Sequence, residues 1–270
     1  MTISGNGGVM ERLHEMEELV DACTWPSEAY WRWFELDALR QRDFSHPLLE
    51  LGCGDGRFTR LLNLVVDVGV DLNPRAVVRA RTLEDVYSSV RCADIRSLET
   101  AERGQYGTVF ANSVFEHVEG IARVLRSCSR LLRAGGTLIT TVPLLDMNDH
   151  LIVRSARYAR FRQHQLQHHN LWRLDHWISE FQAAGFGDVQ VHTYLPGRAC
   201  RTWDALDILG TLGRDRYRVA PAVRKTVSKL LTPQARVTLK RQIAKRLVAL
   251  QPPFDVSDGL CAALIVGTKS

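Results

Sequence analysis

The sequence has no apolar run long enough to cross a membrane, and Met1 to Gly8 lack the basic-then-apolar order of a secretory signal. Its six cysteines show no paired spacing, so neither a disulfide framework nor a cysteine metal site is expected. These absences predict a protein of the reducing cytoplasm. The chain has 270 residues, 45% hydrophobic and 24% charged, which suits one α/β domain of six or seven strands with added segments.

A glycine-rich turn is the most informative motif. Residues 50–56, ELGCGDG, follow the apolar run 47–49 and precede a segment with helical spacing. Its alternating glycines lack the Cβ atoms that would keep a nucleoside away from the backbone: Gly52, Gly54 and Gly56. A dinucleotide-binding fingerprint would continue with glycine where Arg57 stands, and Glu50 brings a carboxylate into the turn. A carboxylate favours a cationic ligand, and S-adenosylmethionine is an adenosine cofactor that carries an ammonium and a sulfonium.

Further polar residues stand at the ends of the next predicted strands. Asp71 ends an apolar segment 21 residues after Glu50, a separation at which an acid meets the ribose of a bound nucleoside. Asp94 ends a third strand and is placed to accept a hydrogen bond from an adenine amino group. A fourth strand ends at Asn112. The spacing therefore predicts several polar groups around one nucleoside.

With these motifs the chain closely resembles the class I S-adenosylmethionine-dependent methyltransferase family. The matching stretches occur in the family's order: 49–56, 69–74, 93–95, 112–118, 131–138 and 183–186. The resemblance implies an α/β fold, a doubly wound, Rossmann-like, seven-stranded mixed sheet with helices on both faces. It implies S-adenosylmethionine as cofactor, bound by Glu50, Gly52, Cys53, Gly54, Gly56, Asp71, Leu72, Asp94, Ile95 and Asn112. We expect an N-terminal helical lid segment over residues 1–45 and a methyltransferase domain over residues 46–270, with insertions at about 144–172 and 200–255.

The segments outside the shared framework are expected to choose the acceptor. Residues 30–34 contain four aromatics, and in this family such a segment commonly lies over the cofactor as a lid. Trp31 and Phe34 can equally bury one face of a helix, so Tyr30 and Trp33 are the substrate candidates there. The insertion at 144–172 adds the substrate candidates Asp146, His150 and His169. His164 and His168 would share a helix face, but no acid or cysteine stands at a metal-ligand distance from them, so no metal is predicted.

A sulfonium is already an activated methyl donor, so catalysis requires alignment of the acceptor and exclusion of water. An alcohol acceptor also needs a base, and His117 lies just past the fourth strand at the methyl end. His117 is therefore the catalytic candidate, and the alternative is a structural residue at the start of a helix. The predicted activity is O-methylation of a sugar, glycolipid precursor or natural-product small molecule.

The segment from Arg214 to Arg246 is strongly basic, with eleven Lys or Arg residues and one acid, Asp215. Two apolar stripes predict two basic amphipathic helices before the last strand. Their charged side either faces water or docks on an anionic membrane or a phosphorylated substrate; nucleic acid is unlikely, because Tyr217 is the lone aromatic. Two rival functions stay open: a non-catalytic binding module that uses these helices to engage a membrane, RNA or protein, and a nicotinamide-dependent oxidoreductase, which Arg57 disfavours. The sequence leaves the oligomeric state unknown.

Overall fold

The computed structural model describes residues 7–98, 103–211, 223, 226, 230–251 and 259–270. At its centre is a seven-stranded sheet in the order β3-β2-β1-β4-β5-β7-β6. The strands are β1 (Leu48–Leu51), β2 (Val66–Asp71), β3 (Tyr87–Cys92), β4 (Tyr106–Asn112), β5 (Leu132–Pro143), β6 (Phe186–Pro196) and β7 (Leu260–Lys269). β1 to β5 run parallel to one another, and β7 runs antiparallel to β5 and β6. This topology confirms the predicted doubly wound mixed sheet.

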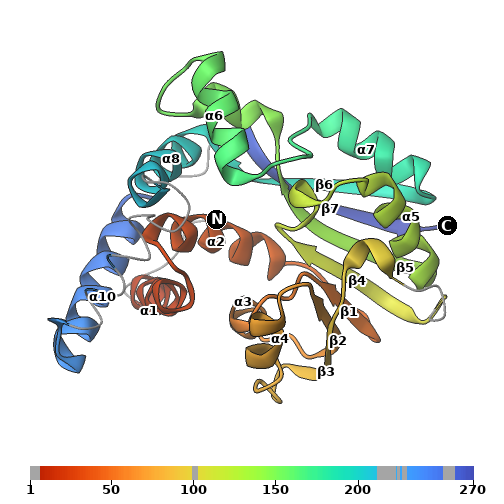
Figure 1. Ribbon diagram of the computed structural model, residues 1–270, viewed down its shortest axis with the longest axis horizontal. Helices are drawn as coiled ribbons and strands as arrows, with labels where there is room; N and C mark the ends of the chain where they lie inside the picture. The colour runs from red at the N-terminus through yellow and green to blue at the C-terminus, as the bar shows by residue number, and fades with distance from the viewer. Residues whose placement is uncertain (1–6, 99–102, 212–222, 224–225, 227–229, 252–258) are drawn as a thin grey trace.

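The helices flank this sheet (Figure 1). They are α1 (Gly7–Ala22), α2 (Pro26–Leu39), α3 (Arg57–Leu61), α4 (Pro74–Ala80), α5 (Ile121–Leu131), α6 (Ala156–Leu166), α7 (Leu174–Ala183), α8 (Gly197–Thr211) and α10 (Pro233–Ala249). Short 3₁₀ turns are η1 (Ile95–Ser97), η3 (Phe115–His117) and η4 (Leu145–His150). Local sequence explains several starts: the Asn73 side chain accepts a hydrogen bond from the Arg75 N–H, and Pro74 occupies the first turn of α4. No described helix is both long and apolar enough to span a bilayer.

Two hydrophobic cores cover the two faces of the sheet. On one face, α5 and α7 contribute Leu125, Trp177 and Phe181, all fully buried. The other core joins the N-terminal helices, α4, α8 and α10 to residues such as Phe110 and Ile139. Each fully buried large apolar side chain contributes roughly 1.5–3 kcal/mol, so both layers hold the sheet firmly. The carboxyl ends of β1, β2 and β4 are thereby fixed relative to one another.

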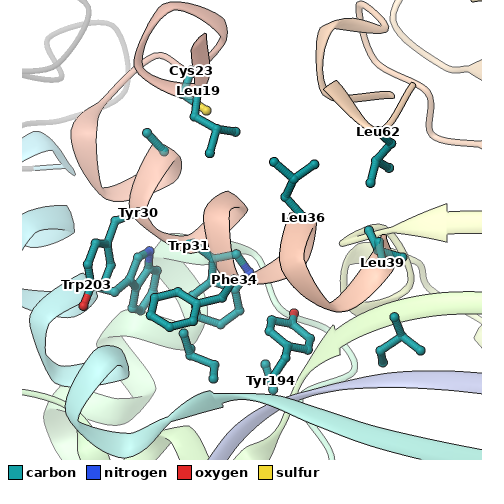
Figure 2. Close-up of a cluster of buried hydrophobic side chains, with 14 of the residues drawn as sticks. Leu19, Cys23, Tyr30, Trp31, Phe34, Leu36, Leu39, Leu62, Tyr194 and Trp203 are labelled. Carbon is teal, nitrogen blue, oxygen red and sulfur yellow. The ribbon is translucent and has the colours of Figure 1, made fainter. Parts of the chain in front are cut away.

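Helix α2 belongs to this second core. Figure 2 shows Tyr30, Trp31 and Phe34 of α2 gathered in one cluster with Tyr194 of β6 and Trp203 of α8. The rings of Trp31 and Trp203 meet edge to face, with centroids 5.0 Å apart. Figure 1 shows α1, α8 and α10 assembled around α2 at one side of the sheet. Of the two predicted basic helices, the second is α10; most of the first lies outside the described residues.

Candidate active site

The glycine turn between β1 and α3 forms the floor of the site. Gly52 has a φ of +70°, and a Cβ on it would lie 2.4 Å from a methyl carbon of Val114, so a side chain does not fit there. Gly54 has a φ of +57°, and a Cβ on it would project into open space. This turn lies where the strand order reverses between β1 and β4, the position at which doubly wound folds bind ligands. The turn therefore presents bare backbone to a ligand.

Asp71, the last residue of β2, holds this turn in place. One carboxylate oxygen accepts a hydrogen bond from the Gly54 N–H at 2.8 Å, and the other accepts from the Asn73 N–H at 2.7 Å. The acid is only partly buried, so its remaining lone pairs face the adjoining cleft. Asp71 thus joins the turn to the adjoining cleft.

An outer cleft of about 480 Å³ opens beside the turn, and we define it by Gly52, Asp71, Leu72, Asp94, Ile95 and His117. Leu72 is 65% exposed on its wall, where a bound adenosine would cover it. Asp94 caps η1 and forms an ion pair with Arg96 at 2.7 Å, which lowers its pKa and keeps it ionised. The predicted adenosine-binding residues therefore meet in one cleft.

An inner cleft of about 170 Å³ shares Gly52 with the outer one, and it contains the other predicted cofactor residues: Glu50, Cys53, Gly54, Gly56 and Asn112. Glu50 is buried, and its two oxygens accept hydrogen bonds from Thr59 Oγ1 and Tyr87 OH, both at 2.7 Å. Burial raises the pKa of Glu50 to about 7, although these hydrogen bonds oppose the shift. Glu28 and Arg32 of α2 also line this cleft. The inner cleft thus offers both signs of charge, which suits the zwitterionic end of an amino-acid ligand.

Glu35 of α2, which sequence reasoning missed, ties this helix to the strand ends. It is fully buried. Five groups donate to its carboxylate: Trp31 Nε1 (2.8 Å), Arg32 Nη1 (2.7 Å), Asn112 Nδ2 (3.1 Å), Tyr194 OH (3.3 Å) and Ser113 Oγ. Ser113 has a φ of +50°, an uncommon conformation for serine that this network supports. Glutamate within an amphipathic helix ordinarily faces water, so no local signal identified Glu35 as a buried hub.

A side pocket of about 230 Å³ adjoins both clefts, and we define it by Trp31, Ser113, Glu116, His117, His168 and Trp203. It shares Ser113 and His117 with the outer cleft, and Arg32 with the inner one. The pocket therefore lies where the two clefts meet. Its mixture of indole rings and titratable groups suits a small organic acceptor.

Burial shifts the titration of the groups on the pocket wall. Desolvation raises the pKa of Glu116 to about 8 and lowers the pKa of His168 to about 3. The pKa of His117 is also lowered, mainly by desolvation and against a hydrogen bond to the backbone of Gln167. Both imidazoles are therefore neutral near pH 7, so each has a nitrogen lone pair.

Of the predicted substrate residues, some line the clefts and others do not. His169 lines the outer cleft. Tyr30 is fully buried, with its hydroxyl donating to the Leu250 carbonyl oxygen at 3.0 Å, so the interpretation of Tyr30 as a substrate contact is corrected to a core residue. Trp33 lies on another side of α2, where Arg12 stacks over its ring at 5.3 Å. Trp31, next to Tyr30 on α2, lines the side pocket instead.

Asp146 and His150 lie on η4, away from the clefts defined above. Asp146 pairs with Arg173 at 3.4 Å, and a Cβ on Gly259 would lie 2.4 Å from His150 Nε2, so that ring packs against the backbone before β7. The proposed helical pair His164 and His168 does not form, because α6 ends at Leu166 and Gln167 adopts a left-handed conformation. The turn directs His168 toward η3 instead of along α6.

Helix α10 carries the described part of the basic segment. It packs on α1 through buried Ala244 and Leu247. Two of its cations pair with acids of α1, Lys240 with Asp21 at 3.3 Å and Arg241 with Glu17 at 3.5 Å. Other cations on it are exposed: Arg236, Lys245 and Arg246. Part of the basic charge therefore serves contacts within the chain.

Comparison with known proteins gives an independent result. Residues 30–191 match the family described as "Methyltransferase domain". Over 232 residues the chain is 23% identical to a malonyl-[acyl-carrier protein] O-methyltransferase of Paenibacillus sp. (strain JDR-2), covering 80% of this chain and 78% of that enzyme. It is 32% identical over 142 residues to a ubiquinone biosynthesis O-methyltransferase of Bradyrhizobium sp. (strain ORS 278), covering 50% of this chain and 54% of the relative.

Among solved structures, the fold is similar to phosphoethanolamine N-methyltransferase 2 of Haemonchus contortus in complex with S-adenosyl-L-methionine. That match has a TM-score of 0.55 and 18% identity, and it covers 88% of this chain and 52% of the other. At this identity the likeness supports the fold alone. The sequence match at the family level extends over the turn, the clefts and η3.

Proposed function

Because the chain belongs to the methyltransferase-domain family and is an S-adenosylmethionine-dependent enzyme, we propose that it methylates an oxygen atom of a small molecule, such as a sugar, glycolipid precursor or natural-product scaffold. The observation that carries this proposal is the side pocket, which brings a carboxyl group and two imidazoles to the junction of the clefts. A hydroxyl must lose its proton to be methylated, whereas a neutral amine need not lose one beforehand. A wall of titratable groups therefore supports an oxygen acceptor.

The residues present fit the cofactor. We propose that the outer cleft holds the adenosine, between the apolar side chains of Leu72 and Ile95 and the acceptors of Asp71 and Asp94. The inner cleft would hold the amino-acid end, among Glu28 and Arg32 of α2 and Glu50 beneath the turn. When bound, S-adenosylmethionine supplies a methyl group already activated by its sulfonium. The chain itself orients the acceptor and excludes water.

His117 is the residue proposed to activate the hydroxyl. Its Nδ1 lies 3.1 Å from the Gln167 carbonyl oxygen, which can only accept, so Nδ1 carries the hydrogen and Nε2 keeps its lone pair. His117 lines both the outer cleft and the side pocket, and this position supports a role between the proposed donor and acceptor sites. Its catalytic role stays a prediction, as does the cytoplasmic location.

A labelled methyl donor, offered with sugars, phenols, lipid-linked hydroxy compounds and amines, tests the proposal. We expect transfer to a hydroxyl compound, and transfer to amines alone would contradict it. With an acceptor found, Trp203→Leu should raise KM for that acceptor by about tenfold or more, because one wall of the side pocket is lost. Trp33→Leu is the matched control, since Trp33 packs against Phe34 outside the three clefts. Affinity for S-adenosylhomocysteine should be unchanged in both variants.

The basic segment suggests a second function, docking on an anionic partner. The exposed cations of α10 support it, and so does the high basic charge of the sequence before it. Cosedimentation with anionic vesicles, lost at high salt, would favour docking, because such attraction is screened. Equal sedimentation with neutral vesicles would contradict it. This docking role is compatible with catalysis, and it becomes the main function only if no acceptor is methylated.

A further inference from the structure

Three potential ligand atoms converge at the base of the side pocket. Glu116, His117 and His168 each offer one, and these atoms all lie within 4.8 Å of one another. Glu116 and His117 belong to η3, immediately after β4, whereas His168 follows α6 about fifty residues later. Two imidazoles and one carboxylate form a donor set that binds divalent transition metals and leaves coordination positions open.

The two segments are fixed together by backbone contacts. The N–H groups of His169 and Asn170 donate to the Glu116 carbonyl oxygen at 2.7 and 3.0 Å. The buried Asn170 amide donates to the carbonyl oxygens of Phe115 and Val118, both at 2.7 Å. These bonds anchor the two residues that directly follow His168 against η3. The cluster is therefore preorganised, as a metal site requires.

Within this cluster, polar atoms remain open. The Glu116 carboxyl is 2% exposed, and its Oε2 has no hydrogen-bond partner among the described residues; the same holds for the buried Nδ1 of His168. Leaving such a group unsatisfied costs about 1–3 kcal/mol, so buried polar atoms without a partner are uncommon. His117 donates its Nδ1 hydrogen to the Gln167 carbonyl, which is the outer contact typical of a metal-bound histidine, and its Nε2 lies 3.8 Å from Glu116 Oε1.

Neighbouring positive charges are already compensated. Arg32 forms an ion pair with Glu35 at 2.7 Å. Arg162 contacts Asp204 and Asp207, each at 2.7 Å. A cation at the cluster would therefore face arginines whose charge is balanced by their own carboxylates. Glu116 lacks such an ion pair to an arginine among the described contacts and is available to a metal.

We propose that Glu116, His117 and His168 bind a divalent transition-metal ion of the Zn²⁺ class at the wall of the side pocket. Imidazole ligands favour such ions over Mg²⁺ and Ca²⁺, which prefer oxygen. The proposal deepens the proposed O-methylation and rests on it for its catalytic meaning. The acceptor hydroxyl would bind at an open position of the metal, which makes its O–H bond more acidic.

The reaction then balances without a further reagent. The acceptor O–H bond breaks and its proton leaves to water. An oxygen lone pair forms a bond to the methyl carbon, the carbon–sulfur bond breaks, and its electron pair stays on the sulfur, which becomes neutral. In this arrangement His117 activates the hydroxyl as a metal ligand and does not accept the proton itself.

Cobalt titration of the full-length, chelator-treated protein tests the site, because Co²⁺ reports its ligands through visible absorption. We expect one Co²⁺ bound per chain and displaced by Zn²⁺. His168→Ala and Glu116→Gln should each weaken binding by at least about tenfold, the loss that even an outer-shell change can cause. His164→Ala is the matched control, an exposed histidine four residues earlier, and should bind as the wild type does.

Affinity for S-adenosylhomocysteine separates the outcomes. Each variant should retain it, which shows that the fold is intact; if His168→Ala does not fold, His168→Gln replaces it. Absence of stoichiometric Co²⁺ binding by wild type, or equal binding by the His168→Ala and His164→Ala variants, would overturn the metal site. Full methyl transfer by the metal-free protein would overturn the catalytic role proposed for the metal while leaving the proposed O-methylation standing.

Discussion

The cofactor side and the acceptor side of the site are built in different ways. On the proposed cofactor side, most candidate residues stand at or just after the end of a strand, as Gly52 follows β1 and Asp71 ends β2. On the acceptor side, the side pocket combines Trp31, His117, His168 and Trp203 from segments far apart in the chain. The carboxyl ends of parallel strands meet at one edge of the sheet because of the topology, whereas the acceptor pocket depends on how the added helices pack.

Glu35 is where the two sides meet, so removing it should have the largest effect. Glu35→Ala deletes the acceptor for Asn112 and Ser113 and leaves Arg32 without its ion-pair partner. Breaking a buried pair in this way costs about 3 kcal/mol or more of unfolding free energy. Denaturant unfolding measures this loss. Glu18→Ala, at an exposed position of α1, is the control and should change stability by less than about 0.5 kcal/mol. Equal effects of the two variants would show that Glu35 does not link the two sides.

A pH experiment isolates the cofactor side. Glu50 has its pKa raised from 4.5 to about 7 by burial, so the folded protein keeps this proton in a range where the unfolded chain has lost it. The stabilisation from this retained proton is therefore full below pH 4.5, falls as the pH rises toward 7, and is lost above that pH. Between pH 4.5 and 7 the unfolding free energy of wild type should fall by on the order of 2–3 kcal/mol more than that of the Glu50→Gln variant. Unfolding free energies measured without cofactor provide the comparison. Parallel curves for wild type and Glu50→Gln would contradict the shifted pKa, and Glu18→Gln should follow wild type.

The glycine turn allows a sharper test, because two glycines share a left-handed backbone conformation but only one of them lies at a cleft. Gly54 and Gly104 both have positive φ, and a Cβ on either would meet no atom within 4 Å. Substitution of either glycine by alanine should therefore lower the unfolding free energy by about 1 kcal/mol. Gly54→Ala alone should weaken S-adenosylhomocysteine binding, by about tenfold, because its Cβ enters the inner cleft. Calorimetric titration distinguishes the pair. Equal S-adenosylhomocysteine affinities in the two variants would show that the ligand does not bind against this turn.

The sequence predicted which residues gather around the glycine turn, and the reason is local; their contacts with a cofactor stay a prediction. The turn, the strand ends and the Asn73-Pro74 helix start are each encoded within a few residues, and the topology brings them together. The acceptor side was predicted poorly. Tyr30 and Trp31 are adjacent in sequence, and only the packing of α2 against α8 decides that Trp31 reaches the pocket while Tyr30 is buried. Likewise, His168 meets Glu116 because of hydrogen bonds to a segment about fifty residues away.

The contact between α10 and α1 should give the smallest effect, although α10 belongs to the most unusual stretch of the sequence. Arg241 pairs with Glu17 at 3.5 Å, and its side chain is 52% exposed. Exposed ion pairs contribute only about 0.2–1 kcal/mol, because water and salt screen them. Arg241→Ala should therefore lower the unfolding free energy by less than about 1 kcal/mol, and the difference should shrink further at high salt. S-adenosylhomocysteine affinity should stay at the wild-type value. A larger loss that persists in salt would mean that α10 stabilises the site through its charges, whereas the structure assigns that role to the buried Ala244 and Leu247.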